Sequence, residues 1–332
     1  MTKNQIRQNI VTKEWVIYSP ERGSRPKDFK ENSGKRDVPE HDNDCPFCSG
    51  NESELGEILL SLSFKGGKNT QTKVIPNKFP ALIPDENTNR TSAEEFYIRM
   101  QGYGRHEVII ENPYHNRDLA VVKKDEMEVV IETYHKRYLT VMKDQENLFP
   151  VIFRNHGKKA GTSLIHPHSQ LIVTGFVPNH VRRRELEAQH YHDEWGRCVY
   201  CDVLNHELKE DKRIIMQTDS MVTFIPFAAE VPFETWIIPV KHQADFGLIN
   251  EKEKEDLAVS LKFILNTFFN KLEDPDYNFI INTSARYEAG EPHLHWYLQI
   301  RPRITTTAGF EIGSGISINP SIPEEDAKYL KS

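Results

Sequence analysis

Two histidines and a glutamine alternate along one short segment, HPHSQ at residues 166–170. On an extended strand every second side chain points to the same face, so His166, His168 and Gln170 would stand in a row. A neutral imidazole is a competent nucleophile toward phosphorus near pH 7, and it also leaves readily. A glutamine amide beside it can donate a hydrogen bond to a phosphoryl oxygen as negative charge builds there. The segment therefore indicates group transfer, with His168 as the nucleophile and Gln170 as the donor.

The residues that precede this segment are suited to hold a phosphate. Asn155, Gly157, Gly161 and Ser163 lie along a stretch that reads as a loop. Glycines let backbone N–H groups approach an anion closely, because no side chain stands in the way. An isolated H-x-H pair is more often structural, so the loop and Gln170 together favour a chemical role for His168.

All the cysteines of the chain fall into two C-x-x-C pairs, Cys45 with Cys48 and Cys198 with Cys201. In a reducing compartment, paired C-x-x-C motifs indicate a metal site before a disulfide. A thioredoxin-like redox pair is the alternative, but it would need a strand-to-helix turn, which CPFCSGNESE does not suit. Two thiolates combined with two imidazoles are typical of tetrahedral zinc.

Each C-x-x-C pair is followed by two histidines in the same order, which predicts two closed, structural metal sites. The ligands predicted for the first site are Cys45, Cys48, His115 and His166. Those predicted for the second site are Cys198, Cys201, His242 and His295. His293 is the alternative to His295, because the two would share one face of a strand. Iron is an alternative metal at the second site, and free thiols with unrelated histidines are the alternative to both sites.

The two halves of the chain echo each other beyond their cysteines, which indicates a duplicated unit. HEVIIENPYH at 106–115 aligns with FETWIIPVKH at 233–242, and HPHSQLI at 166–172 aligns with HWYLQIR at 295–301. The matched pairs are Glu107 with Glu234, His115 with His242, His166 with His295, and Gln170 with Gln299. Tyr297 then falls where His168 stands, so we expect the second half to be catalytically silent.

The elements that must position these residues follow from hydrophobic periodicity. Helical spacing predicts helices over residues 125–148, 179–196, 250–272 and 323–331. Alternating or continuous apolar runs predict strands over residues 106–112, 149–155, 169–174, 221–226, 233–239, 277–282 and 295–301. The fold class predicted is α+β, with duplicated units of antiparallel sheet and flanking helices. We place the catalytic half at residues 1–176 and the silent half at residues 177–332.

Composition narrows the functional classes. Of 332 residues, 38% are hydrophobic and 27% are charged, as in a soluble globular protein. The formal net charge of −7 argues against a nucleic-acid-binding protein, which would present a basic face. We expect no membrane partner, because no apolar run reaches the length of a membrane span. The N-terminal residues lack the apolar core of a signal peptide, so a cytoplasmic location is expected.

These motifs resemble the galactose-1-phosphate uridylyltransferase branch of the histidine-triad superfamily along almost the whole chain. The matching segments are EWVIYSPERGSRP with Arg22 and Arg25, PNKFPAL with Asn77 and Phe79, the stretch from Asn155 through Gly161 and Ser163 to Gln170, and AGFEIGSGISINP with Glu311. The resemblance implies that Ser163 joins His168 and Gln170 in the catalytic centre. It also implies that Arg22, Arg25, Asn77, Phe79, Asn155, Gly161 and Glu311 bind the nucleotide or the hexose.

The reaction that the resemblance implies is a ping-pong transfer of UMP through His168. UDP-glucose would release glucose 1-phosphate, and galactose 1-phosphate would then accept the UMP to give UDP-galactose. The expected partners are therefore a nucleotide sugar and a hexose 1-phosphate. Family members are usually homodimers whose active sites borrow residues from the partner chain, and the expected cofactor is zinc, two ions per chain.

Three departures from the family pattern keep other reactions open. Ser169 stands where enteric-type members have glycine, and Lys78 stands where an acidic residue often follows the pocket asparagine. The second C-x-x-C pair, absent from enteric-type members, resembles a plant-type relative that acts on ADP-glucose with phosphate as acceptor. The alternatives are thus an adenylyl-transferring phosphorylase acting on ADP-glucose or a dinucleoside polyphosphate, and a non-enzymatic, zinc-stabilised binding module.

Overall fold

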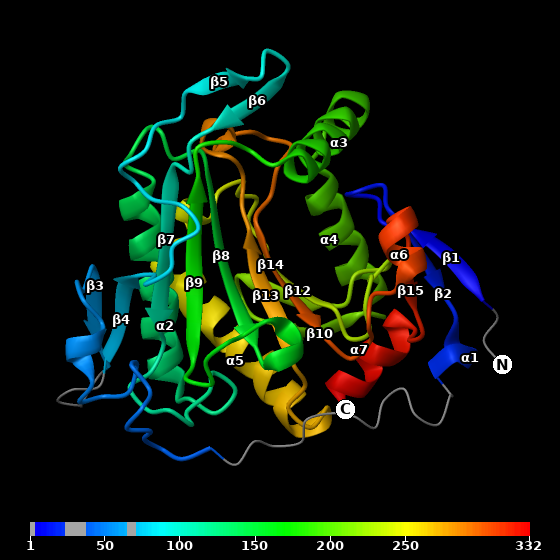
Figure 1. The fold of residues 1–332 in the computed structure, drawn as a ribbon. Coiled ribbons are helices and arrows are strands. Elements are labelled where there is room, and N and C mark those ends of the chain that lie inside the picture. Colours follow the sequence, from blue (N-terminus) through cyan, green and yellow to red (C-terminus); the bar gives the residue numbers. More distant parts are fainter. Residues whose placement is uncertain (1–3, 24–37, 65–70) are drawn as a thin grey trace.

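The computed structural model describes residues 4–23, 38–64 and 71–332, and its centre is a ten-stranded sheet (Figure 1). Every neighbouring pair of strands in this sheet runs antiparallel. The strands, in spatial order, are β10 (Ile214–Gln217), β11 (Met221–Phe224), β12 (Thr235–Pro239), β14 (Tyr297–Pro302), β13 (Tyr277–Asn282), β8 (Phe149–His156), β9 (His168–Thr174), β7 (Gly104–Ile110), β4 (Gln71–Pro76) and β3 (Leu60–Ser63).

The sheet repeats one five-stranded unit about its middle. Outward from the centre, the first half runs β8, β9, β7, β4, β3, and the second runs β13, β14, β12, β11, β10. In both halves a long helix connects the third strand to the central one. The central strands β8 and β13 pair with each other, so the two units share one continuous sheet. The predicted fold class, duplicated antiparallel units with flanking helices, is confirmed.

Seven helices accompany the sheet within the described part of the chain. They are α1 (Pro20–Gly23), α2 (Lys124–Val141), α3 (Asn179–Trp195), α4 (Val199–Glu210), α5 (Glu251–Lys271), α6 (Gly309–Ser314) and α7 (Pro323–Lys331). Helix α5 begins with a capping box, in which the Asn250 side chain accepts from the Glu253 N–H and the Glu253 carboxylate accepts from the Asn250 N–H. Helix α2 ends at Val141, seven residues before the predicted end, because the Asn147 amide donates to the Val141 carbonyl and turns the chain.

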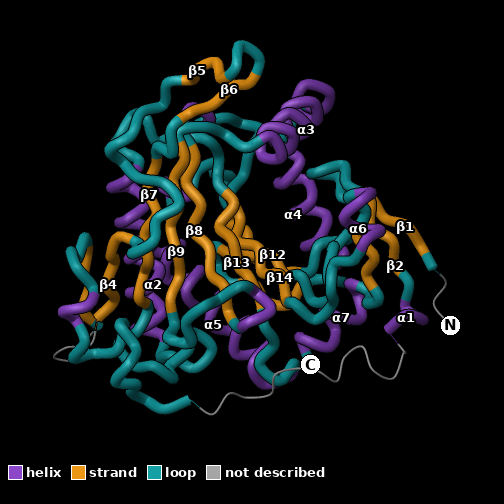
Figure 2. The backbone as a smooth tube through the Cα atoms, in the orientation of Figure 1, coloured by secondary structure: helices purple, strands orange, loops and turns teal. Residues whose placement is uncertain are grey.

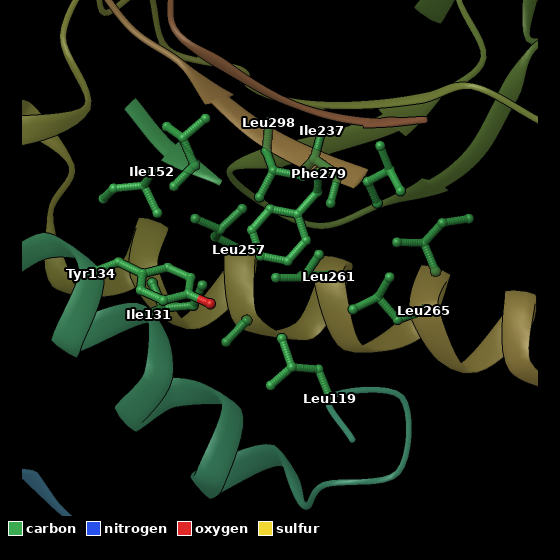
Figure 3. Packing of buried hydrophobic residues seen from close by; sticks show 14 of the residues in the cluster. Leu119, Ile131, Tyr134, Ile152, Ile237, Leu257, Leu261, Leu265, Phe279 and Leu298 are labelled. Atoms are coloured by element: carbon green, nitrogen blue, oxygen red, sulfur yellow. The ribbon is translucent and has the colours of Figure 1, made fainter. Parts of the chain in front are cut away.

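The core lies between one face of the sheet and the helices α2 and α5. Figure 3 shows Ile131 and Tyr134 of α2 and Leu257 and Leu261 of α5 packed toward Phe279 of the sheet. All five side chains are fully buried. The other face of the sheet carries a second buried cluster over its second half, which includes Phe224, Trp236 and Leu204 of α4, and it carries His168 over its first half, since side chains alternate between the two faces.

Two smaller sheets lie outside this layer. The first contains β1 (Gln5–Gln8), β2 (Trp15–Tyr18) and β15 (Ser317–Asn319), and the second contains β5 (Arg90–Ala93) and β6 (Tyr97–Met100). Figure 2 shows the strands of the large sheet as one band, with loops gathered at its ends. Among the described helices, none combines the length and the apolar character that crossing a membrane requires.

Strand pairing corrects one register of the internal repeat. Gln170 of β9 lies opposite Val108, and Gln299 of β14 lies opposite Trp236. If the two glutamines are equivalent, Val108 matches Trp236. Two residues earlier along the strand, His106 and not Glu107 therefore matches Glu234. The stretch from His106 to His115 is one residue longer than the stretch from Glu234 to His242, so His115 still matches His242.

Candidate active site and metal centres

The first C-x-x-C pair and two distant histidines converge on one point. The Sγ atoms of Cys45 and Cys48 and one ring nitrogen each of His115 and His166 lie within 4.8 Å of one another, and all four side chains are buried. Cys48 Sγ lies 3.5 Å from Nδ1 of His115 and 3.6 Å from Nδ1 of His166. The loop that carries both cysteines, the loop after β7 that carries His115, and the residues just before β9 are thus brought together.

The surroundings of this cluster fit a metal ion. His166 donates from Nε2 to the Asn112 carbonyl at 2.7 Å, which leaves the Nδ1 lone pair facing the thiols. Burial lowers the pKa of His166 to about 4, so the imidazole is neutral. Burial also raises the pKa of Cys45 to about 11. A divalent cation would supply the positive charge that the thiolate form needs.

The second cluster brings together three of its four predicted ligands. Donor atoms of Cys198, Cys201 and His242 lie within 4.8 Å of one another, with Cys201 Sγ 3.3 Å from Nδ1 of His242. The His295 ring lies 5.4 Å from the His242 ring, and its Nε2 is buried without a hydrogen-bond partner. An orphaned ring nitrogen beside a thiol pair fits a fourth ligand. His293 is instead turned toward Glu291, 3.7 Å away.

His168 begins β9, with its side chain directed away from the helices. Its Nδ1–H donates to the His166 carbonyl at 2.8 Å, so Nε2 carries an unshared electron pair. Burial lowers the pKa of His168, which favours the neutral, nucleophilic imidazole. The Phe47 ring, from within the first C-x-x-C motif, meets the His168 ring edge-on with centroids 5.6 Å apart. The loop that carries the first C-x-x-C motif therefore packs directly against the candidate nucleophile.

Gln170 and Asn155 lie on the same open face as His168. Phe153 of β8 pairs with Gln170, and Asn155 stands two residues further along β8, toward His168. The carbonyl oxygen of Asn155 accepts from the Asn278 amide at 2.7 Å. The NH₂ group of Asn155 is thus the part that a ligand on this face would meet.

The loop between β8 and β9 departs from the predicted phosphate-binding arrangement, because the N–H groups of Ala160, Gly161 and Thr162 donate to carbonyls within the loop itself. Gly157 and Gly161 adopt positive φ values of 85° and 91°, which glycine alone adopts without strain. The Lys159 N–H donates to Asp276 at 2.6 Å and anchors the loop to the sheet. Ser163 is exposed in the remainder of this loop.

The predicted nucleotide-binding residues near β4 are only partly enclosed. Asn77 follows β4, and its carbonyl oxygen accepts from the Phe79 N–H at 2.9 Å. Phe79 itself is 82% exposed, so in this chain alone its ring covers little. Asn77 also contacts His106, which lies between Asn77 and Gln170.

Two predicted residues, Arg22 and Glu311, are not brought to His168 within the described chain. Arg22 is exposed on α1, and Glu311 caps α6 by accepting from the Ala308 N–H at 3.1 Å. Figure 1 shows α1 and α6 beside the three-stranded sheet, well away from β9. Arg25 lies outside the described residues.

A buried polar network behind β9 was not anticipated. Ser169 points to the helix side, where its hydroxyl and that of Tyr134 both donate to Glu111. Arg154 donates to Glu111 at 3.0 Å and to Asp118 at 2.5 Å. The strand alternation that placed His168 and Gln170 on one face could have placed Ser169 on the other. Its partners could not be read from the sequence.

Arg154→Met should destabilise the protein strongly. Arg154 and Glu111 are both almost completely buried, so the change leaves a buried carboxylate without its counter-charge. We expect the free energy of unfolding to fall by about 3–5 kcal/mol in urea denaturation. Arg183→Met is the matched control, since the Arg183–Glu14 pair is largely exposed and should cost no more than about 1 kcal/mol. Equal losses in the two variants would contradict this account.

Comparison with known proteins places the chain in a family. Residues 1–178 match the model of the galactose-1-phosphate uridyl transferase N-terminal domain, and residues 184–313 match that of its C-terminal domain. The ADP-glucose phosphorylase of Arabidopsis thaliana is 36% identical over 330 residues, which cover 98% of this chain and 92% of that protein. The galactose-1-phosphate uridylyltransferase of Haemophilus influenzae is 28% identical over 293 residues, covering 88% and 81%.

A solved structure agrees over the same length. The crystal structure of an ADP-glucose phosphorylase from Arabidopsis thaliana with bound ADP-glucose matches with a TM-score of 0.84 and 32% identity, covering 100% of this chain and 99% of that one. Both family models and a relative 36% identical over nearly the whole chain lead to one conclusion: this chain belongs to the galactose-1-phosphate uridyl transferase family.

Proposed function

We propose that this protein transfers a nucleoside monophosphate between phosphorylated acceptors by a ping-pong mechanism, with the nucleotide carried on Nε2 of His168. The observation that carries the proposal is the bond from His168 Nδ1–H to the His166 carbonyl, which aims an unshared pair away from the backbone. The predicted metal ligand His166 and the proposed nucleophile are therefore linked by one hydrogen bond.

The proposed reaction has two steps. Nε2 attacks the α-phosphorus of a nucleotide sugar, a P–N bond forms, and the bond to the bridging oxygen breaks to release the sugar 1-phosphate. An acceptor phosphate oxygen then attacks the same phosphorus and displaces the imidazole. Gln170, and Ser163 if the loop closes over the substrate, would donate hydrogen bonds to the phosphoryl oxygens. Asn155 would hold the same phosphate through its NH₂ group, and the N–H groups around Gly161 could join it only by giving up their bonds within the loop.

We favour ADP-glucose as the donor and inorganic phosphate as the acceptor, with ADP and glucose 1-phosphate as products. The support is the 36% identity to an ADP-glucose phosphorylase and the likeness to a structure with bound ADP-glucose. The second C-x-x-C group also resembles that type of enzyme. Lys78, exposed beside Asn77 and Phe79, replaces the acidic residue that often stands there in uridylyltransferases.

The second candidate is the reaction expected from the sequence, transfer of UMP from UDP-glucose to galactose 1-phosphate. It is supported by the uridylyltransferase relatives, of which the Haemophilus influenzae enzyme is 28% identical. The intact His168–Gln170 pair argues against the third possibility, a binding module without activity.

We further propose two zinc ions per chain and a homodimer. Each zinc would fix its C-x-x-C loop to a strand and supply folding energy, and neither would touch the transferred phosphate.

Arg22 and Glu311 lie far from His168 in their own chain, which supports their acting in the partner's active site, with Arg25 as a further candidate. Cysteines that bind zinc and form no disulfide would fit a cytoplasmic location.

The choice between donors can be tested by trapping the adduct. With ³²P in the α-phosphate, ADP-glucose should label the protein, without acceptor, at least tenfold faster than UDP-glucose. The label should survive base and be lost in acid, as for a phosphoramidate. Adding phosphate should then discharge labelled ADP. Faster labelling by UDP-glucose, with discharge by galactose 1-phosphate, would instead establish uridylyl transfer.

A further inference from the structure

His106 contacts Gln170 at the open face of the sheet. Nε2 of His106 lies 2.7 Å from Oε1 of Gln170 and 3.0 Å from Nδ2 of Asn77. On the opposite side of the ring, the Ala81 N–H donates to Nδ1 at 3.1 Å. His106 therefore connects the chain after β4 with the row of residues on β9.

These contacts determine where the His106 proton is. Because Nδ1 accepts from the Ala81 N–H, the neutral ring must carry its hydrogen on Nε2. The oxygen of Gln170 is the acceptor within reach of Nε2–H, while the Asn77 nitrogen only packs against it. Gln170 is thus held by its carbonyl oxygen, and its NH₂ group is left to face a phosphate.

The second half of the chain holds its equivalent glutamine the other way round. Glu234 stands at the position of His106, and its Oε1 accepts from Nε2 of Gln299 at 2.7 Å. The NH₂ group of Gln299 is therefore directed to Glu234. The side-chain carbonyl oxygen of Gln299 accepts from the Asn282 amide at 3.4 Å. The second half keeps the asparagine and the glutamine of the first half, with Asn282 in the place of Asn155 and Gln299 in the place of Gln170. It replaces two histidines, His106 by Glu234 and His168 by Tyr297.

We propose that His106 is a positioning residue that sets the polarity of the Gln170 amide, so that a donor and not an acceptor faces the transferred phosphate. The proposal rests on the proposed function, because Gln170 matters only if phosphoryl charge develops beside it. A reversed amide would present a carbonyl oxygen to the phosphoryl oxygens and repel the charge that builds in the transition state.

Two variants of equal size test this. In His106→Gln the new amide nitrogen takes the place of Nε2–H and keeps a donor toward Gln170. In His106→Glu the side chain offers only acceptors and should capture the NH₂ group, as Glu234 captures that of Gln299. In single-turnover labelling with saturating nucleotide sugar, we expect His106→Glu to slow adduct formation about 10²–10³-fold, the range for one lost transition-state donor. His106→Gln should stay within about tenfold of the wild type.

A double-mutant cycle separates orientation from simple charge repulsion. If His106 acts through Gln170, His106→Glu should slow the Gln170→Ala variant by less than about threefold. His106→Leu, which adds no charge, should show the same non-additivity and serves if His106→Glu fails to fold. Equal rates for His106→Gln and His106→Glu, or additive losses in the cycle, would overturn this inference alone. A wild-type protein that forms no adduct with either nucleotide sugar would overturn the proposed function as well.

Discussion

His168→Asn should fold, keep its metal, bind nucleotide sugar and form no covalent adduct. The amide nitrogen of asparagine takes roughly the place of imidazole Nδ1, so the bond to the His166 carbonyl at 2.8 Å can persist. The Nε2 electron pair, by contrast, has no counterpart. We expect transfer to fall by several orders of magnitude, because the covalent pathway is removed and not merely one stabilising contact.

The measurement is steady-state transfer together with nucleotide-sugar affinity by calorimetry. His190→Asn is the control, since His190 is an exposed histidine of α3, and its rate should match that of the wild type. Addition of an activated nucleotide imidazolide should partly rescue His168→Gly by supplying the missing ring. Transfer by His168→Asn at near the wild-type rate would leave the family assignment intact and the covalent histidine wrong.

Loss of the first metal centre should have the second large effect, on stability. Cys48 Sγ faces both His115 and His166, so Cys48→Ser removes the thiolate that both predicted imidazole ligands share. Structural zinc contributes about 10–16 kcal/mol of apparent binding energy in small zinc peptides. Even about 5 kcal/mol would lower Tm by roughly 7 °C in a chain of this size.

Elemental analysis and thermal unfolding check this together. Wild-type protein purified without chelator should hold close to two zinc ions per chain, and Cys48→Ser should hold one. Cys201→Ser should lose the other ion, and its folded fraction should still form the adduct, because Tyr297 and not a nucleophilic histidine stands in that half. Metal-free wild-type protein, or Cys48→Ser with unchanged metal and Tm, would contradict the structural-metal proposal.

The sequence predicted those parts of the fold that depend on local pattern. Strand β13 and helix α7 have the predicted bounds, 277–282 and 323–331. The convergence of Cys45, Cys48, His115 and His166 could be predicted in full, because cysteine and histidine types are rare and their order is repeated. Helix α4 is not among the predicted elements, although Tyr200, Leu204 and Leu208 have helical spacing.

Features that depend on long-range pairing could not be predicted. The joining of β8 to β13 into one sheet is a pairing between residues more than a hundred positions apart, which no local pattern encodes. The role of His106 depends on another long-range pairing, that of β7 with β9. Aligning Glu107 with Glu234 by residue type hid the equivalence that the strands establish, in which His106 and Glu234 each hold a glutamine.

The central claim is that His168 carries the nucleotide, and peptide mapping tests it most directly. Wild-type protein mixed with ADP-glucose or UDP-glucose, without acceptor, should be quenched in base, digested and analysed by mass spectrometry. We predict the mass of one nucleoside monophosphate on the peptide that contains His168, with fragmentation placing it on that residue, and an equal burst of glucose 1-phosphate. A nucleotide on any other residue, or glucose 1-phosphate released only when acceptor is present, would contradict the account.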